Sequence, residues 1–259
     1  MNLASTEYLR CPACAGKITP APSTLSCTQC RRSFPFDNGI PVLLEQDSAA
    51  VREHIAALDV EMARYPLVLM AIALLARVWL PAERRRLIGH IGLCPGGMIL
   101  DHCTALGRNL PALASAIGPS GKLVAMDLSR TMVQETRRFA RRKNMTVDIH
   151  QADALNLPYA NACFDAVVHY GAINQFADHQ RQVIDEIVRV TKSGGIIVIL
   201  DEGIEPGKGT TWWAKLLTWR NELFASRPPL ELLPSGVDPQ VEWVLRGLFY
   251  QIVFHKPSS

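Results

Sequence analysis

The sequence predicts an α/β fold built on a doubly wound parallel sheet. From residue 97 onward, apolar runs typical of strands alternate with amphipathic runs typical of helices. This alternation predicts parallel strands joined by helical crossovers. Two other patterns complete the organisation. Cysteines cluster near the start of the chain, and the late segment VEWVLRGLFYQIVFHK predicts an antiparallel hairpin on the sheet edge.

Length and composition allow one large domain and a small appendage. The chain has 259 residues, of which 48% are hydrophobic, and its net charge is +3. This charge is too mild to indicate a nucleic-acid partner. The opening MNLASTEYLRCPAC has no apolar signal-peptide core, so we expect a reducing, cytoplasmic location. The sequence does not indicate an oligomeric state.

Residues 1–45 are expected to form a zinc ribbon. The segments CPAC and CTQC supply Cys11, Cys14, Cys27 and Cys30. Two CxxC pairs on opposed turns close a tetrahedral thiolate site, and a structural zinc would stabilise a segment too short to bury much core. The alternative is a set of vestigial or redox-active thiols.

Residues 46–95 are expected to form a helical linker or lid. The run Leu67–Leu80 is apolar except for Arg77. It is too short to cross a bilayer as a helix, so we expect no transmembrane segment. It is interpreted as a buried core or lid helix, with a wall of an apolar substrate pocket or a peripheral membrane contact as alternatives. The following AERRRLIGHIGL predicts a helix with Arg84, Arg85 and Arg86 on a solvated face.

Residues 96–259 contain the predicted sheet, and acids follow its strands. Asp101, Asp127 and Asp153 each stand at or just after a strand-like run. Ligands of such sheets lie beyond the carboxyl ends of the strands. Asp127 is placed to bind ribose hydroxyls, and Asp153, beside the Ala154 amide, to accept from an adenine amine. Each acid alone fits a helix cap or a surface carboxylate, but their order and spacing together indicate a nucleotide site.

The order LDxxxxxG, VAMDLS, ADALNLPYANACFDAVV and EIVRVTKSGGIIVI over residues 97–203 resembles class I S-adenosylmethionine-dependent methyltransferases. The loop GAINQFADHQRQVIDEIVRV resembles bacterial small-molecule enzymes of this family, of the type 11 kind, including those of quinone biosynthesis. The resemblance implies a Rossmann-like, seven-stranded sheet ending in a hairpin. It also implies S-adenosylmethionine as cofactor. Carried over by position, the cofactor-binding residues are Asp101, Cys103, Ala105, Gly107, Asp127, Leu128, Asp153, Ala154 and, through its backbone carbonyl, His169.

The turn after Asp101 departs from the family pattern. Its usual glycine places are Cys103, Ala105 and Gly107. Glycine allows close backbone approach and positive φ there. Either the turn is slightly wider and still binds the cofactor, or the site is degenerate or holds the cofactor for another purpose.

Few polar residues stand near the expected methyl position. His169 and Tyr170 are the catalytic candidates among the polar residues at the strand ends, which also include His102, Asn174, Gln175 and His179. The insert 204–239 carries an apolar stripe, Trp212, Trp213, Leu216, Leu217 and Trp219. This stripe packs into the core or forms a cap that, with Leu67–Leu80, walls an apolar substrate cavity.

We therefore expect methyl transfer to a hydrophobic small molecule, in the biosynthesis of a specialised metabolite or a quinone-like compound. One alternative is an RNA methyltransferase that contacts RNA through the ribbon, although the ribbon carries few basic residues. Another is a cofactor-binding protein without turnover. The basic helix RTMVQETRRFARRKN is interpreted as a solvated face.

Overall fold

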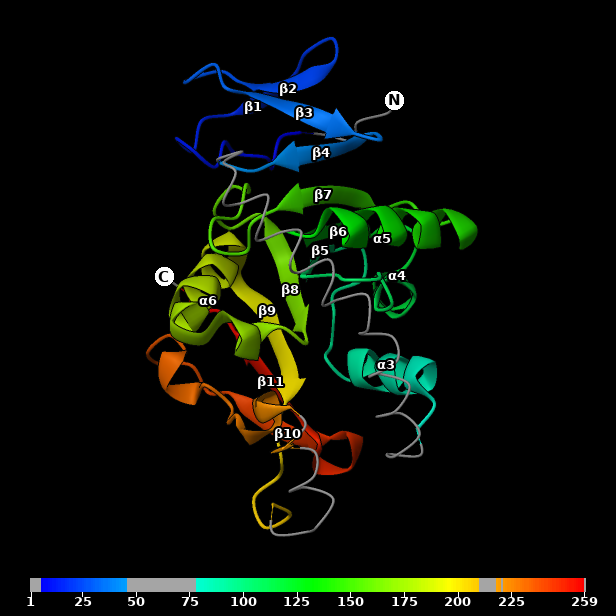
Figure 1. Cartoon of the computed structure of the whole chain (residues 1–259), viewed down its shortest axis with the longest axis vertical. Coiled ribbons are helices and arrows are strands. Elements are labelled where there is room, and N and C mark those ends of the chain that lie inside the picture. The colour runs from blue at the N-terminus through cyan, green and yellow to red at the C-terminus, as the bar shows by residue number, and fades with distance from the viewer. Residues whose placement is uncertain (1–5, 46–77, 210–217, 220, 259) are drawn as a thin grey trace.

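The computed structural model describes residues 6–45, 78–209, 218–219 and 221–258. Its centre is one sheet with the strand order β1-β2-β3-β4-β7-β6-β5-β8-β9-β11-β10 (Figure 1). The sheet therefore has eleven strands where seven were expected, because four strands of the N-terminal segment join its β7 edge.

The first seven strands are β1 (Ile18–Pro20), β2 (Thr24–Cys27), β3 (Ser33–Asp37), β4 (Ile40–Leu43), β5 (Met98–His102), β6 (Lys122–Asp127) and β7 (Asp148–Ala152). The others are β8 (Phe164–Tyr170), β9 (Thr191–Glu202), β10 (Gln240–Val244) and β11 (Phe249–His255). The described helices are α3 (Leu80–Gly89), α4 (Leu110–Ile117), α5 (Arg130–Arg142) and α6 (Gln180–Val190). Short 3-10 helices are η1 (Ile173–His179), η2 (Glu222–Ala225), η3 (Leu230–Leu232) and η4 (Leu245–Gly247).

The central strands are parallel and the last two are antiparallel, as predicted. β7, β6, β5, β8 and β9 pair in parallel, so their carboxyl ends share one edge. β11 runs antiparallel to β9, and β10 returns along β11 through η4. The resulting hairpin closes the sheet at the side opposite the N-terminal strands.

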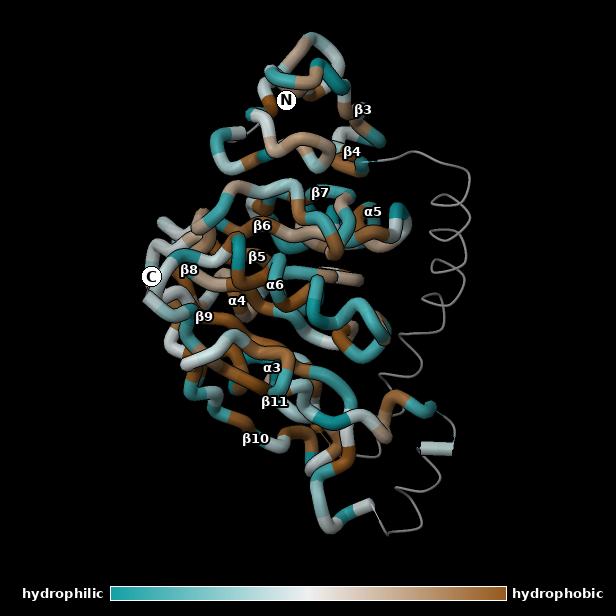
Figure 2. The backbone as a smooth tube through the Cα atoms, turned by 90° about the vertical axis from the view of Figure 1, so that its left-hand side faces the viewer, coloured by the Kyte–Doolittle hydropathy of each residue, from teal (hydrophilic) through white to brown (hydrophobic). Residues whose placement is uncertain are grey.

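Helices cover both faces of the sheet. Ile99 packs with residues of α3, α4 and α5, whereas its neighbour Leu100 packs with α6 on the opposite face. This alternation follows from the two-residue period of strands. Figure 2 shows the hydrophobic residues concentrated along the central strands.

The helix α5 separates an apolar from a basic face. Ser129 caps its start by accepting a hydrogen bond from the Met132 amide at 3.1 Å. Its buried residues recur at helical spacing, and they are Met132, Val133, Thr136, Phe139 and Ala140. The arginines therefore lie on the outer side of this helix.

The N-terminal segment continues the sheet and the core. β4 pairs in parallel with β7, with Val42 opposite Gln151 and Leu43 opposite Ala152. The Tyr8 hydroxyl donates to Asp148 at 2.8 Å, and Tyr8 packs in the same cluster as Leu100. The segment thus covers an edge of β7 that would otherwise expose unpaired backbone groups.

Of the helices predicted before the sheet, the structure describes the one after residue 80. The helix after residue 80 is present as α3, but of its three arginines Arg84 turns inward, where its Nε donates to Asn109 at 3.1 Å. Most of the segment Leu67–Leu80 lies outside the described residues, as does most of the apolar stripe of the insert. Among the helices described, none has the length and apolar character needed to span a membrane.

Candidate cofactor-binding site

The carboxyl ends of the parallel strands bring the predicted site residues to one edge of the sheet. His102 at the end of β5 lies opposite Met126 of β6 and His169 of β8. Asp127 ends β6, opposite Gln151 of β7. Asp153 follows β7 directly. The expected convergence of these strand ends is therefore present.

The turn after β5 adopts a glycine-type backbone without most of the glycines. φ is +53° at Cys103, +48° at Ala105 and +67° at Gly107. The Thr104 amide donates to the Met126 carbonyl and the Gly107 amide to the Thr104 carbonyl, each at 2.9 Å. All three glycine places of the family pattern therefore keep left-handed φ, which costs a non-glycine residue about 1–2 kcal/mol.

Gly107 is the one place in the turn where a side chain has no room. A Cβ there would lie 3.0 Å from both Leu110 Cδ1 and Thr136 Cγ2. The Thr136 hydroxyl also donates to the Ala105 carbonyl at 2.7 Å, so a residue of α5 is hydrogen-bonded to the turn. The turn therefore combines a tight glycine with two positions that tolerate a small side chain.

The Asp101 carboxylate is fully buried and bonded within its own turn. It accepts from the Thr104 hydroxyl and, at 3.2 Å, from the Asn109 side chain. Burial raises the pKa of Asp101 to about 6, against these hydrogen bonds and the nearby Arg84 charge, which lower it. Asp101 therefore fixes the turn to the start of α4.

Asp127 fixes the other side of the turn. Its carboxylate accepts from the Ala105 amide at 2.9 Å and from the Ser129 amide at 3.0 Å. Gln151 on the neighbouring strand donates to the Leu128 carbonyl at 2.9 Å. Asp127 is only partly buried, so its carboxylate reaches both the turn and the surface.

The next strand end adds a further carboxylate and an amide. Asp153 is partly buried and accepts from the Leu155 amide at 2.9 Å. Ala154 beside it is buried. The pair directly follows β7, the strand beside the one that Asp127 ends.

The Cys103 thiol is influenced by the charges of four aspartates. Burial raises the pKa of the Cys103 thiol, and the charges of Asp127, Asp101, Asp153 and Asp201 raise it further. Asp201 lies near the end of β9. It was not among the predicted site residues, because the sequence shows it only as an acid that ends the apolar run IIVILDE. It accepts from the Asn174 amide at 2.9 Å and from the Glu202 amide at 2.8 Å. Burial and the neighbouring Glu202 carboxyl raise the pKa of Asp201 well above its ordinary value, so this buried acid favours its neutral form.

His102 and His169 form a buried pair that the sequence did not predict. Their Nδ1 atoms lie 2.7 Å apart, so one ring donates an N–H hydrogen bond and the other accepts it. Both Nε2 atoms are buried, with no hydrogen-bond partner among the described residues. Burial lowers the pKa of His169 to about 3 and, with the charge of His169, lowers that of His102. In this geometry the His169 Nδ1 atom is bonded to His102, and its Nε2 atom is buried away from solvent.

The other polar candidates differ in their surroundings. The Tyr170 hydroxyl donates to the Gln251 side chain at 3.0 Å, and Tyr170 is partly exposed. Asn174 is buried and donates to the Glu202 carbonyl at 2.8 Å, while it accepts from the Tyr250 hydroxyl at 2.9 Å. Gln175 and His179 are exposed. Of the two catalytic candidates, only Tyr170 is open to the surface.

The four N-terminal cysteines converge. The Sγ atoms of Cys11 and Cys30 lie 3.7 Å apart, and those of Cys14 and Cys27 3.5 Å apart. All four ligand atoms lie within 4.8 Å of one another and none is in a disulfide. Four thiolates around one zinc at 2.3 Å would stand about 3.8 Å apart. The spacing therefore fits one tetrahedral zinc ion.

Replacing Ala105 with glycine should stabilise the protein, because glycine adopts φ of +48° without strain. We expect Ala105→Gly to raise the free energy of unfolding by about 0.5–1 kcal/mol in urea titrations. The matched control is Ala114→Gly within α4, which should lower it by about 1 kcal/mol. Equal destabilisation by both changes would show that the turn carries no strain.

The buried histidine pair should make the fold sensitive to acid. In the unfolded chain His169 binds a proton when the pH is below its ordinary pKa near 6.5, whereas in the fold its pKa is about 3. The contribution of His169 to the free energy of unfolding is therefore fully present above pH 6.5. It falls as the pH drops toward 3, by about 2–3 kcal/mol at pH 4.5. The raised pKa of Asp101 acts in the opposite direction below pH 6.

The double variant His102→Leu/His169→Leu should therefore lose less stability than the unchanged chain between pH 7 and 4.5, measured by urea titration at each pH. The exposed His90 gives the control His90→Leu, which should follow the unchanged chain. The same acid dependence in all three proteins would contradict the assignment of a neutral buried pair.

Part of this chain is similar in sequence to known proteins. Residues 99–195 match a family model described as a methyltransferase domain. A demethylmenaquinone methyltransferase of Lactobacillus johnsonii is 32% identical over 120 residues, which are 46% of this chain and 49% of that protein. One from Desulfitobacterium hafniense is 25% identical over 151 residues, 56% of this chain and 59% of that protein. The chain thus spans about half the length of these curated relatives.

A solved structure agrees on the fold. An S-adenosylmethionine-dependent methyltransferase from Aquifex aeolicus superposes with a TM-score of 0.52 at 18% identity, over 67% of this chain and 89% of that one. At this identity the likeness concerns the fold alone. With the sequence match and the strand order, it confirms the resemblance seen in the motifs. Residues 99–195 thus match a methyltransferase domain in sequence, and the described sheet shares the fold of a solved S-adenosylmethionine-dependent methyltransferase.

Proposed function

We propose that this chain binds S-adenosylmethionine at the carboxyl ends of its parallel strands and transfers the methyl group to a hydrophobic, quinone-like small molecule. The carrying observation is that the partly buried Asp127 and Asp153 stand at the ends of neighbouring parallel strands, where acids can accept from ribose hydroxyls and an adenine amine. Asp127 also binds the left-handed turn through the Ala105 amide, and this turn offers backbone rather than bulky side chains.

The chain's residues fit the parts of this cofactor. Asp127 and Leu128 would contact the ribose of the cofactor, and Asp153 and Ala154 would contact its adenine. The backbone of residues 103–107, held by Asp101, would face the methionine part, with the His169 carbonyl near its amino group. Cys103 and Ala105 keep the backbone shape of the glycine turn, which supports binding despite the changed residues.

The cofactor supplies a methyl group already bonded to a good leaving group. The protein's part is therefore to align the acceptor and to exclude water. Among the candidates at the acceptor end, Tyr170 is partly exposed whereas His169 is buried, so we assign Tyr170 the substrate contact. His169 supports the site through its backbone and its bond to His102.

The substrate class rests on the relatives. The two similar proteins named above are demethylmenaquinone methyltransferases, and the loop after β8 resembles enzymes of that kind. A demethylated menaquinone is therefore the first acceptor to test, with specialised metabolites of similar hydrophobic character next. No observation on the described residues of the ribbon favours RNA as the methyl acceptor.

Cofactor binding should depend on Asp127. We expect calorimetry to detect binding of S-adenosylmethionine and of its demethylated product to the full chain. Asp127→Asn removes a charged acceptor and should weaken binding on the order of 10- to 100-fold. Asp185→Asn, on the exposed side of α6, is the matched control and should bind as the unchanged chain does.

Two results would contradict the proposal. Absence of binding at millimolar cofactor would exclude the enzyme and leave a degenerate domain. Methylation of a demethylated menaquinone is measured by mass spectrometry of the quinone. If the chain binds S-adenosylmethionine but does not methylate this quinone, the proposed substrate is excluded, while the proposed cofactor is not.

We propose in addition that Cys11, Cys14, Cys27 and Cys30 hold one structural zinc ion. The sulfur spacing supports this, as do the amides of Gln29 and Cys30, which donate to the Cys27 sulfur at 3.4 and 3.5 Å. Such donors stabilise a thiolate ligand. Because Cys11 and Cys27 belong to the main core cluster, the metal would stabilise the whole domain.

The purified chain should contain about one zinc per molecule by elemental mass spectrometry. Cys30→Ser removes an exposed ligand without disturbing the core and should lower both zinc content and thermal stability. Cys94→Ser, also exposed and far along the chain, should change neither. A zinc content unaffected by Cys30→Ser would exclude this site.

A further inference from the structure

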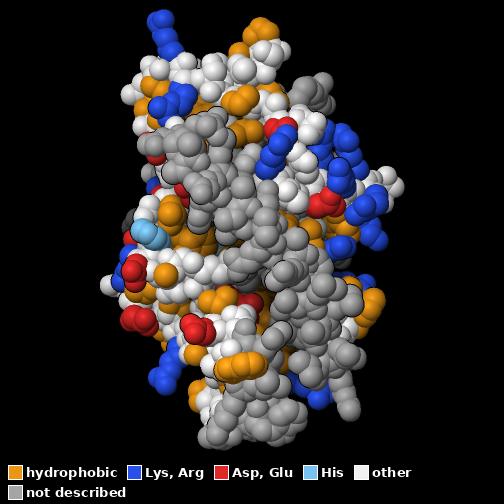
Figure 3. Space-filling model, viewed as in Figure 1, with side chains coloured by type: hydrophobic (Ala, Val, Ile, Leu, Met, Phe, Trp, Pro, Cys, Tyr) orange, Lys and Arg blue, Asp and Glu red, His pale blue; other side chains and the backbone are white. Residues whose placement is uncertain are grey.

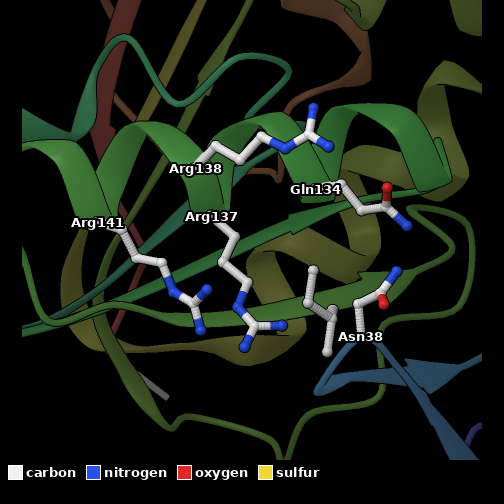
Figure 4. A pocket seen from close by; sticks show the side chains of 6 residues that line it. Asn38, Gln134, Arg137, Arg138 and Arg141 are labelled. Atoms are coloured by element: carbon white, nitrogen blue, oxygen red, sulfur yellow. The ribbon is translucent and has the colours of Figure 1, made fainter.

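A groove lies between the N-terminal strands and the outer face of α5. Asn38 and Ile40 of the β3–β4 hairpin form one wall, and Gln134, Arg137, Arg138 and Arg141 of α5 form the other. Its volume is about 330 Å³. Figure 4 shows the guanidinium groups of Arg137 and Arg141 side by side on the groove side of the helix, while Arg138 points away.

The hairpin is held against α5 by a polar clamp. Asp37 accepts from Arg130 through both oxygens, at 2.6 and 2.8 Å, and from Gln134 at 2.8 Å. Gly39 then passes the Arg137 guanidinium closely, since a Cβ there would lie 3.1 Å from both terminal nitrogens. The position of Arg137 in the groove is therefore set by the fold.

The charges of this groove are not balanced within the described part of the chain. Asp37 is taken up by Arg130 and Gln134, and Glu135 pairs with Arg138. Arg137 and Arg141 have no carboxylate partner among the described residues. Burial lowers the pKa of Arg137, and the charge of Arg141 lowers it further. Two like charges four residues apart also destabilise a helix.

We propose that this groove binds a phosphate monoester through Arg137 and Arg141. Two guanidinium groups present planar pairs of N–H donors that match phosphate oxygens, and a dianion balances both charges at once. The Asn38 side chain on the opposite wall offers a neutral polar contact. The helix geometry puts the two arginines about 12–18 Å along α5 from Ser129, hence away from the strand ends.

This site is separate from the proposed methyl-transfer site and does not depend on it. The basic helix was interpreted from the sequence as a solvated face. Figure 3 shows the Lys and Arg side chains gathered over α5, and the groove makes part of that face concave. The phosphate monoester belongs either to a free small molecule or to a lipid headgroup such as that of phosphatidic acid.

The test uses the full chain with inorganic phosphate and phenyl phosphate in calorimetry at low salt. We expect saturable binding that weakens at least tenfold in Arg137→Gln/Arg141→Gln. Arg142→Gln is the matched control, because it removes an exposed charge from the same helix outside the groove, and it should bind within twofold of the unchanged chain. Circular dichroism melting confirms that the variants fold.

Vesicles distinguish the two sources. Groove-dependent binding to phosphatidic acid vesicles, beyond that to phosphatidylglycerol vesicles of equal charge, assigns a lipid headgroup. Binding of free phosphate alone assigns a small molecule. Absence of phosphate binding, or equal weakening in Arg142→Gln, overturns the proposal. So does groove-dependent binding of a single-stranded RNA without any phosphate monoester binding, since that would assign a diester backbone.

Discussion

The buried carboxylate of Asp101 is the constraint on which the candidate site depends. It has no room to reach solvent and therefore must be satisfied by its own turn, through Thr104 and Asn109. Those two bonds fix where α4 begins. Asp127 then binds the Ala105 amide from the neighbouring strand, so the turn is held from two strands at once. A turn held in this way keeps its left-handed conformation without two of its glycines.

The sequence predicted the parts of this domain that rest on periodicity. The alternation of strands and helices, the antiparallel hairpin and the acids at the strand ends are all present. The hairpin could be predicted because two apolar runs flank a short turn with Gly247. Asp127 and Asp153 could be predicted because parallel strands align their carboxyl ends. Their binding roles are proposals that the structure supports only by position.

Other features depend on contacts that no local pattern encodes. His102 and His169 are 67 positions apart, and only the pairing of β5 with β8 places them in contact. The pairing of β4 with β7, which gives eleven strands rather than seven, likewise depends on an edge that the sequence does not reveal. Arg84 was expected in solvent with its neighbours, yet the buried Asn109 draws it inward. In each case the outcome depends on a contact between residues far apart in the sequence.

The N-terminal segment has a second consequence beyond covering the β7 edge. By extending the sheet through β4, it places the β3–β4 hairpin beside α5, and Asp37 clamps that hairpin to Arg130. Asp37, the hairpin carboxylate near the basic face, is paired with Arg130. Arg137 and Arg141 therefore have no carboxylate partner among the described residues. The proposed cofactor site at the strand ends and the proposed phosphate site on the flank of α5 therefore lie apart. The docking of the N-terminal segment against α5 forms the second of them.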